Sequence, residues 1–195
     1  MNNLTLKSCV FNNFMSYGNN VNEFTFPNGL VWMTADNGSG KSTLVEAINF
    51  ALFGTSYRGG NKSELKNTRN VDGTLRVILE FDCEKVAGIV ESYRVTRSIS
   101  PKGTTKFEVE KLEGDVWVSQ SKRAGYGQKD FETSILGFSE VLFKNTIAMN
   151  TQDDIATIRK RIESKYTITD ADFTKLMQAA GKPALAQNYG IHDGF

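Results

Sequence analysis

Short segments in which hydrophobic and polar residues alternate occupy much of the first 120 residues. Such alternation has the period of a half-buried β-strand. It is loose over residues 4–11 and regular over residues 21–26, after which residues 27–29 (PNG) predict a turn. Four more such segments, with turn residues between them, occur at residues 75–82, 88–99, 105–112 and 116–119. The pattern predicts an initial hairpin and a later antiparallel meander.

Three segments between these strands have other patterns. Residues 30–33 (LVWM) form a continuous apolar run, which is typical of a strand buried on both faces. A helix that starts near Lys41 is predicted next, with Gly54 as its C-terminal stop. Residues 55–73 are polar and basic, contain glycine, and predict a loop. The apolar residues at helical spacing are Leu44, Val45, Ile48, Ala51 and Leu52.

The last third of the chain is expected to contain three helices and one strand. Residues 129–136 predict a helix, and the apolar centre of residues 143–154 predicts a last strand that ends near Asn150. Residues 153–165 predict a helix with a basic face. A final helix is expected from the N-cap Thr169 through Ala180, before Gly181 and Pro183. The whole pattern indicates an α/β (α+β) fold with a helical C-terminal tail.

Residues 35–42 (ADNGSGKS) lie between the predicted buried strand and the first predicted helix. They match the phosphate-loop pattern G-x-x-x-x-G-K-[ST], except that Ala35 stands at the first glycine. Gly38 and Gly40 permit backbone angles and a close approach that a side chain would block. Successive N–H groups then form a nest for phosphate oxygens at the positive end of the helix. Ala35 is compatible with such a loop if its φ is negative.

The side chains that follow extend this chemistry to a nucleotide. Lys41 is expected to reach the β- and γ-phosphates, and Ser42 to give its hydroxyl to Mg²⁺. Thr43 is expected to hydrogen-bond the α-phosphate. An ordinary glycine turn is the alternative, but it would not require this strand-to-helix context. The predicted ATP-binding residues are Asn37, Gly38, Ser39, Gly40, Lys41, Ser42 and Thr43.

Composition adds mainly exclusions. The chain has 195 residues and a formal net charge of +1, so no global field indicates nucleic acid or a membrane surface. Cys9 and Cys83 lie in apolar, strand-like segments and are expected to be reduced, buried thiols. The N-terminus does not resemble a signal peptide, and no apolar stretch is long enough to cross a bilayer. A cytoplasmic or nucleoid-associated protein is therefore expected, without a membrane partner.

Several motifs occur in a fixed order along the chain. They are NFMSYG (residues 13–18), an F-x-x-G-L step (26–30), NGSGKST (37–43), YRVTRSI (93–99) and FKNTIAMNTQDDI (143–155). Together they resemble the N-terminal lobes of the SbcC-like ATPases of DNA-repair and recombination exonucleases, which are related to the structural-maintenance-of-chromosomes (SMC) proteins. The resemblance implies an ABC-type ATPase head lobe at residues 1–158, a P-loop NTPase fold with an antiparallel meander. Residues 159–195 would be a divergent helical tail.

The resemblance also implies further site residues. Gln152 takes the Q-loop role, in which it ligates Mg²⁺ together with Ser42 and helps to place the attacking water. Lys62 is similar to a lysine near the nucleotide. A solvated glutamine that caps a helix and a solvated loop lysine are the respective alternatives. Asn13 stands near the place where relatives often have a basic residue that touches phosphate.

Two parts that the family needs for hydrolysis are not found in the sequence. One is a strand that ends in Asp-Glu, and the other is a serine-glycine signature loop. Residues 77–84 (VILEFDCE) are the best match to such a strand, but Glu80 interrupts the apolar run and the alternation favours a half-exposed strand. In relatives both parts lie in a C-terminal lobe, beyond a coiled coil and a zinc hook. We therefore expect the chain to resemble the N-terminal half of a head, and to self-associate or to need a partner that covers its apolar surface.

Three functions remain open from the sequence. The first is an ATP-binding lobe of an exonuclease ATPase, whose partners are a second ATPase lobe or a full-length head, an SbcD-type nuclease subunit and, in the assembled complex, DNA. The second is a truncated, non-catalytic nucleotide-binding module that docks on full-length heads and regulates them. The third is a stand-alone NTPase or small-molecule kinase. Two groups of basic residues would either contact DNA or form solvated faces: Arg58, Lys62, Lys66 and Arg69, and Arg159, Lys160, Arg161 and Lys165.

Overall fold

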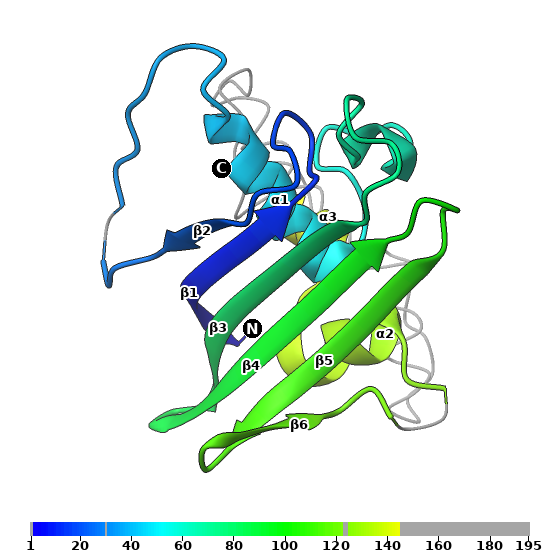
Figure 1. Cartoon of the computed structure of the whole chain (residues 1–195). Coiled ribbons are helices and arrows are strands. Elements are labelled where there is room, and N and C mark those ends of the chain that lie inside the picture. Colours follow the sequence, from blue (N-terminus) through cyan, green and yellow to red (C-terminus); the bar gives the residue numbers. More distant parts are fainter. Residues whose placement is uncertain (1, 30, 123–124, 145–195) are drawn as a thin grey trace, which may run out of the picture. The chain divides into compact units, whose positions relative to one another are not determined.

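A six-stranded antiparallel sheet forms the main body of the structure (Figure 1). The computed structural model describes residues 2–29, 31–122 and 125–144. The strand order is β2-β1-β3-β4-β5-β6, so that the predicted hairpin and the predicted meander join into one sheet through β1 and β3. The strands are β1 (Asn3–Asn12), β2 (Asn22–Thr25), β3 (Leu75–Val86), β4 (Ile89–Ile99), β5 (Thr105–Glu113) and β6 (Val116–Ser119).

The two faces of this sheet differ in polarity because side chains alternate along each strand. On one face the pairing aligns Leu79 with Val95, and Val95 with Val109, and all three are fully buried. On the opposite face Glu80 pairs with Arg94, and Arg94 with Glu110. The apolar face needs a cover, and the helices supply it.

Two helical segments lie against the apolar face (Figure 1). Helix α1 (Lys41–Phe53) contacts β1, β3 and β4. Helix α2 (Gln128–Phe131) continues directly into a π-helical turn, η2 (Glu132–Leu136), which contacts β3. The Phe131 ring lies 6.5 Å from the ring of Phe81, which ties α2 to the apolar face. Short helices also occur at η1 (Lys62–Leu65) and α3 (Glu140–Leu142).

The predicted helix and its stop are confirmed, but its buried surface extends well beyond the predicted apolar positions. Gly54 has φ 70°, and its N–H donates to the Phe50 carbonyl at 2.8 Å, which ends α1 as expected. Val45 is 44% exposed, although it was predicted on the apolar face. Polar residues of the helix are buried as well, among them Glu46 and Asn49. Periodicity alone missed them because their partners come from the loop that follows the helix.

The predicted buried strand at residues 30–33 is wrong over its described part. Residues 31–36 are not in a strand, and Trp32 is 82% exposed. An apolar run is buried on both faces only where neighbouring strands flank it. No strand in the described part of the chain pairs with this segment. The side chains of Val31 and Met33 are consequently 43% and 40% exposed.

Some of the other predictions are confirmed, and others fall on residues that the structure does not describe. Apart from η1, residues 55–73 are loop, as expected, and the helix predicted at 129–136 begins at Gln128. Of residues 143–154, only Phe143 and Lys144 are described, and neither belongs to a strand. The helices predicted at 153–165 and 169–180, and the domain boundary near residue 158, lie outside the described residues.

A buried arginine fixes the C-terminal end of α1 to the sheet. Arg97 on β4 is only 7% exposed, and its guanidinium donates to the carbonyls of Ala51 at 2.7 Å and Leu52 at 3.3 Å. These carbonyls have no partner inside the helix. Burial lowers the pKa of Arg97 to about 9. The positive charge lies at the negative end of the helix dipole, and Gln128 of α2 donates to Leu52 O as well.

Replacing Arg97 with methionine tests this anchor. The methionine side chain would keep apolar volume but leave the Ala51 carbonyl without its donor, so we expect R97M to lower the free energy of unfolding by about 2–3 kcal/mol. The matched control is R94M, which removes an arginine from the polar face of the same strand. Because the Arg94 ion pairs are partly exposed, that loss should stay below about 1 kcal/mol. Equal losses in urea unfolding of the two variants would contradict the anchoring role of Arg97.

Candidate nucleotide-binding site

The glycine-rich loop leads directly into the N-terminus of α1 and has the backbone geometry that its sequence predicts. Gly38 and Gly40 have φ values of 84° and 93°, in the left-handed region that glycine tolerates best. Ala35 is not among the residues with positive φ, so alanine at the first glycine position causes no strain of this kind. Gly40 is the N-cap of α1, and its carbonyl accepts the Thr43 N–H at 2.9 Å.

The loop concentrates hydrogen-bond donors and positive charge. The first N–H groups of α1 have no acceptor inside the helix, and they lie at its positive end. The Lys41 ammonium donates to the carbonyls of Ala35 at 2.5 Å and Asp36 at 2.8 Å. No carboxylate among the described residues forms an ion pair with Lys41. The ammonium is therefore held by neutral groups of its own loop, and its charge is available to an anion.

A hollow of about 320 Å³ opens over this loop. It is lined by Met15, Ser16, Asn37, Gly38, Gly40, Lys41, Ser42, Thr43 and Arg58. Six of these residues were predicted from the loop motif. Of the other predicted site residues, Ser39 and Lys62 do not line the hollow, and Gln152 lies outside the described residues. Met15, Ser16 and Arg58 come from two other loops, and sequence patterns did not place them at the site.

A buried carboxylate positions the loop that carries Arg58. Glu46 is 1% exposed on α1, and its two oxygens accept the N–H groups of Tyr57 at 2.8 Å and Arg58 at 3.1 Å. The Arg58 Nε lies 3.7 Å from the same carboxylate. The side chain of Arg58 is 59% exposed and reaches the hollow from this fixed backbone. Glu46 lies outside the predicted apolar stripe of α1, so the sequence pattern carried no signal for this contact.

A third loop, residues 13–18, forms another wall of the hollow. Met15 in this loop has φ 49°, and its backbone is fixed on both sides: its N–H donates to Leu65 O at 2.7 Å, and its carbonyl accepts the Asn67 side-chain amide at 2.8 Å. Asn13 does not line the hollow. Its side-chain oxygen accepts from the side-chain amide of Asn70 at 3.1 Å, so the structure gives no support for a phosphate contact by Asn13.

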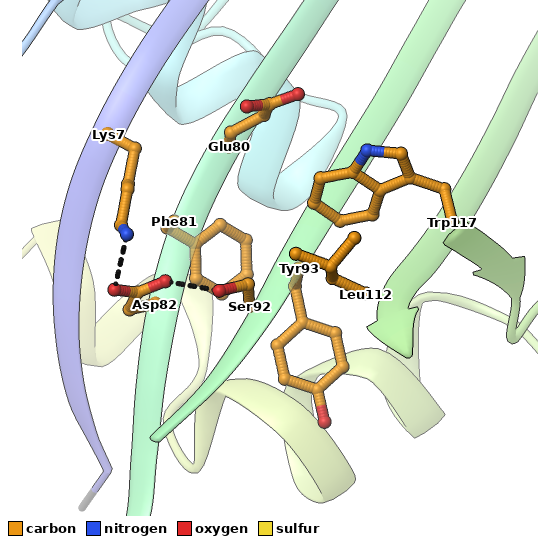
Figure 2. A pocket seen from close by; sticks show the side chains of 8 residues that line it. All are labelled: Lys7, Glu80, Phe81, Asp82, Ser92, Tyr93, Leu112 and Trp117. Atoms are coloured by element: carbon orange, nitrogen blue, oxygen red, sulfur yellow. Dashed lines mark hydrogen bonds and ion pairs between the residues drawn. The ribbon is translucent and has the colours of Figure 1, made fainter. Parts of the chain in front are cut away.

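The acidic side chains of the segment that best matches a catalytic acidic strand lie on the polar face of the sheet, opposite the face that α1 covers. Figure 2 shows Glu80 and Asp82 on the polar face, around a shallow hollow of about 120 Å³, with the helices behind the sheet. Asp82 pairs with Lys7 at 2.8 Å and accepts the Ser92 hydroxyl at 2.6 Å, while Glu80 pairs with Arg94 at 2.9 Å. The half-exposed strand favoured by the alternation is confirmed. No cluster of three or more potential metal ligands from His, Cys, Asp and Glu occurs in the described ranges.

A glycine loop that opens into a helix packed on a sheet is the arrangement expected of a P-loop domain. A family model described as an AAA domain matches residues 8–182, and the chain belongs to that family. It is 31% identical over 153 residues to exonuclease subunit 2 of Escherichia phage RB69, which covers 77% of this chain and 25% of that protein. It is also 36% identical over 105 residues to the DNA double-strand break repair Rad50 ATPase of Methanocaldococcus jannaschii, covering 53% and 10%.

A solved structure agrees with these relationships at the level of the fold. The Smc head domain from Pyrococcus furiosus, bound to the C-terminal domain of ScpA, matches with a TM-score of 0.56 and 20% identity over 92% of this chain and 46% of that chain. The predicted resemblance to SbcC-like exonuclease ATPases is confirmed by the exonuclease subunit and Rad50 matches, and the Smc head domain agrees in fold. The chain spans about a quarter of the length of the exonuclease subunit it matches. Within the described ranges, no helix has the length and hydrophobicity that crossing a membrane requires.

Replacing Glu46 with glutamine tests how the Arg58 loop is held. The glutamine side chain keeps one acceptor but turns an amide donor toward a backbone N–H, so we expect E46Q to lower the free energy of unfolding by about 1–3 kcal/mol. Urea unfolding at neutral pH measures the change. The control is E64Q, at an exposed position of η1, which should leave the midpoint unchanged. An unchanged midpoint in E46Q would show that the carboxylate does not fix this loop.

Proposed function

We propose that this chain is the ATP-binding lobe of a DNA-repair or recombination exonuclease ATPase. Hydrolysis would require a second lobe that supplies the signature loop and the acidic Walker B strand. The observation that carries the proposal is the hollow over the glycine loop, where helix-terminal amides, Lys41, Ser42 and Arg58 converge. Their donors and positive charge suit a triphosphate.

The residues of the loop would divide the phosphate tail among them. The amides of Gly38 and Gly40 would bind the β-phosphate, and Lys41 would exchange its carbonyl partners for β- and γ-phosphate oxygens. Ser42 would give its hydroxyl to Mg²⁺, which would offset phosphate charge when bound. Thr43 would hydrogen-bond the α-phosphate. Arg58 adds a second cation at the open side of the hollow.

Two further residues belong to the proposal through the family resemblance. Gln152 would join Ser42 as a Mg²⁺ ligand, and Lys62 would contribute charge near the nucleotide. Lys62 is exposed on η1 and outside the lining of the hollow, so its effect would be an electrostatic one through solvent. Replacement of Lys62 should therefore affect nucleotide affinity less than replacement of Lys41.

The exposed apolar segment at residues 31–33 supports a requirement for a second lobe. A run with Trp32 at 82% exposure is unusual beside a polar loop, and contiguous apolar surface commonly marks an interaction site. The proposed partners are a second ATPase lobe or a full-length head, an SbcD-type nuclease subunit and DNA in the assembled complex. The proposed location is the cytoplasm, in association with the nucleoid.

Nucleotide binding depends on Lys41 under this proposal. We expect K41A to weaken Mg-ATP affinity by about 10- to 100-fold, the effect of losing hydrogen bonds from a charged donor, without a change in the unfolding midpoint. Isothermal titration on the full chain measures this. The control is K102A, in the turn between β4 and β5, which should bind as the parent does. Equal affinities of K41A and the parent would rule out the phosphate-loop role.

The requirement for a second lobe is tested by turnover. Phosphate release is measured for the chain alone, for the chain mixed with a C-terminal lobe of an SbcC-like ATPase, and for an intact head titrated with the chain. Activity that arises only on mixing supports the proposal. Inhibition of the intact head would favour a regulatory module, and turnover by the chain alone would contradict the proposal.

A further inference from the structure

Tyr17 connects the loop at residues 13–18 to the phosphate loop. Its hydroxyl donates to the Ser39 carbonyl at 3.2 Å. Its ring lies edge-on to the ring of Phe11, with centroids 5.0 Å apart and an interplanar angle of 85°. Phe11 is buried in β1, so the tyrosine ring is supported by the sheet while its hydroxyl reaches the loop.

The hydrogen bond to Ser39 determines where the next amide points. Carbonyl and N–H groups of one trans peptide unit point in opposite directions, and no cis peptide bond occurs among the described residues. A Ser39 carbonyl held toward Tyr17 therefore directs the Gly40 N–H the other way. Gly40 lines the hollow, whereas Ser39 and Tyr17 do not. The hydroxyl thus favours the peptide orientation in which the Gly40 N–H points away from Tyr17, on a residue that lines the hollow.

The tyrosine ring also fixes the position of the Gly40 backbone. A Cβ atom built on Gly40 would lie 2.5 Å from the Tyr17 hydroxyl oxygen and 2.6 Å from its Cε2. These distances are too short for any side chain, so the ring lies directly against the glycine Cα. Gly38, by comparison, has open space at the same place. The Tyr17 ring therefore packs behind the phosphate loop at Gly40 but not at Gly38.

Tyr17 is itself held from a third loop. The side-chain amide of Asn67, which is 5% exposed, donates to Tyr17 O at 3.2 Å and to Met15 O at 2.8 Å. The Tyr17 N–H donates to Phe14 O at 2.9 Å. Buried donors and backbone bonds therefore set the tyrosine before any ligand arrives.

We propose that Tyr17 is a positioning residue for phosphate binding: its ring and hydroxyl hold the Ser39–Gly40 peptide with the N–H directed into the hollow. The inference rests on the proposed nucleotide-binding function. Tyr17 does not touch the ligand and acts through Gly40. The ligand class is a nucleoside di- or triphosphate, because the β-phosphate is the group that the Gly40 amide would meet.

This role predicts a dependence on the number of phosphates. A loosened Ser39–Gly40 peptide weakens ligands that carry a β-phosphate, whereas AMP does not reach this amide. A purely structural defect would instead lower stability and weaken all three nucleotides alike. The ratio of ATP affinity to AMP affinity therefore separates the two roles.

The test compares Y17F and Y17A with the parent chain by isothermal titration with ATP, ADP and AMP in the presence of Mg²⁺. Y17F keeps the ring, and we expect ATP and ADP to bind about 2- to 5-fold more weakly, the effect of one neutral hydrogen bond. Y17A removes the ring as well, and we expect ATP and ADP to bind about tenfold more weakly or worse. AMP affinity should remain unchanged in both. The control is Y93F, which removes a hydroxyl from β4 and should bind all three nucleotides as the parent does.

The outcomes separate the positioning role of Tyr17 from nucleotide binding by the chain. If the parent binds ATP through Lys41 and Y17A binds ATP equally well, the positioning role is overturned while nucleotide binding stands. If the parent binds no nucleotide, both fail. Should Y17A not fold, Y17F decides through the amide resonance of Gly40. ATP should shift that resonance less in Y17F than in the parent, and an identical shift with identical affinity would overturn the inference.

Discussion

The candidate site depends on the way α1 is seated on the apolar face of the sheet. At its C-terminal end the carbonyls of Ala51 and Leu52 are bonded to Arg97, a buried cation on β4. That contact satisfies groups that the helix leaves open and places positive charge at the negative end of the dipole. With that end fixed, the N-terminal end of α1 projects its unpaired amides at the glycine loop. The same helix is therefore bonded to the sheet at one end and presents its amides at the phosphate loop at the other.

Three loops from separate parts of the chain meet around this helix end, and a different side chain holds each one. Glu46 accepts the amides of residues 57 and 58, Asn67 donates to the carbonyls of residues 15 and 17, and Tyr17 donates to the carbonyl of Ser39. Glu46 and Asn67 are buried and paired, so water competes little for their bonds. The two loops that Glu46 and Asn67 hold are consequently fixed without a ligand, which lowers the ordering cost of binding.

Much of the fold could be predicted because it is encoded by local periodicity. The alternation in β3 to β6 and the glycine after α1 needed no knowledge of neighbours. The buried strand predicted over residues 31–33 was wrong because its burial depends on neighbours: an apolar run becomes a buried strand only beside other strands. In the site, the loop motif identified six lining residues, whereas Arg58 and Tyr17 act through contacts between distant segments. Glu46 lies opposite the predicted apolar positions of α1, so neither its burial nor its partners could be inferred from periodicity.

Amide hydrogen exchange of the full chain, with and without Mg-ATP, tests the central claim most directly. Because the three loops converge on one hollow, ATP should slow exchange over residues 37–43, with smaller effects at residues 15–17 and 57–58. The meander strands far from the hollow should exchange as before. Unchanged exchange over residues 37–43 at saturating Mg-ATP, or protection confined to another part of the chain, would contradict the claim that this loop holds the nucleotide.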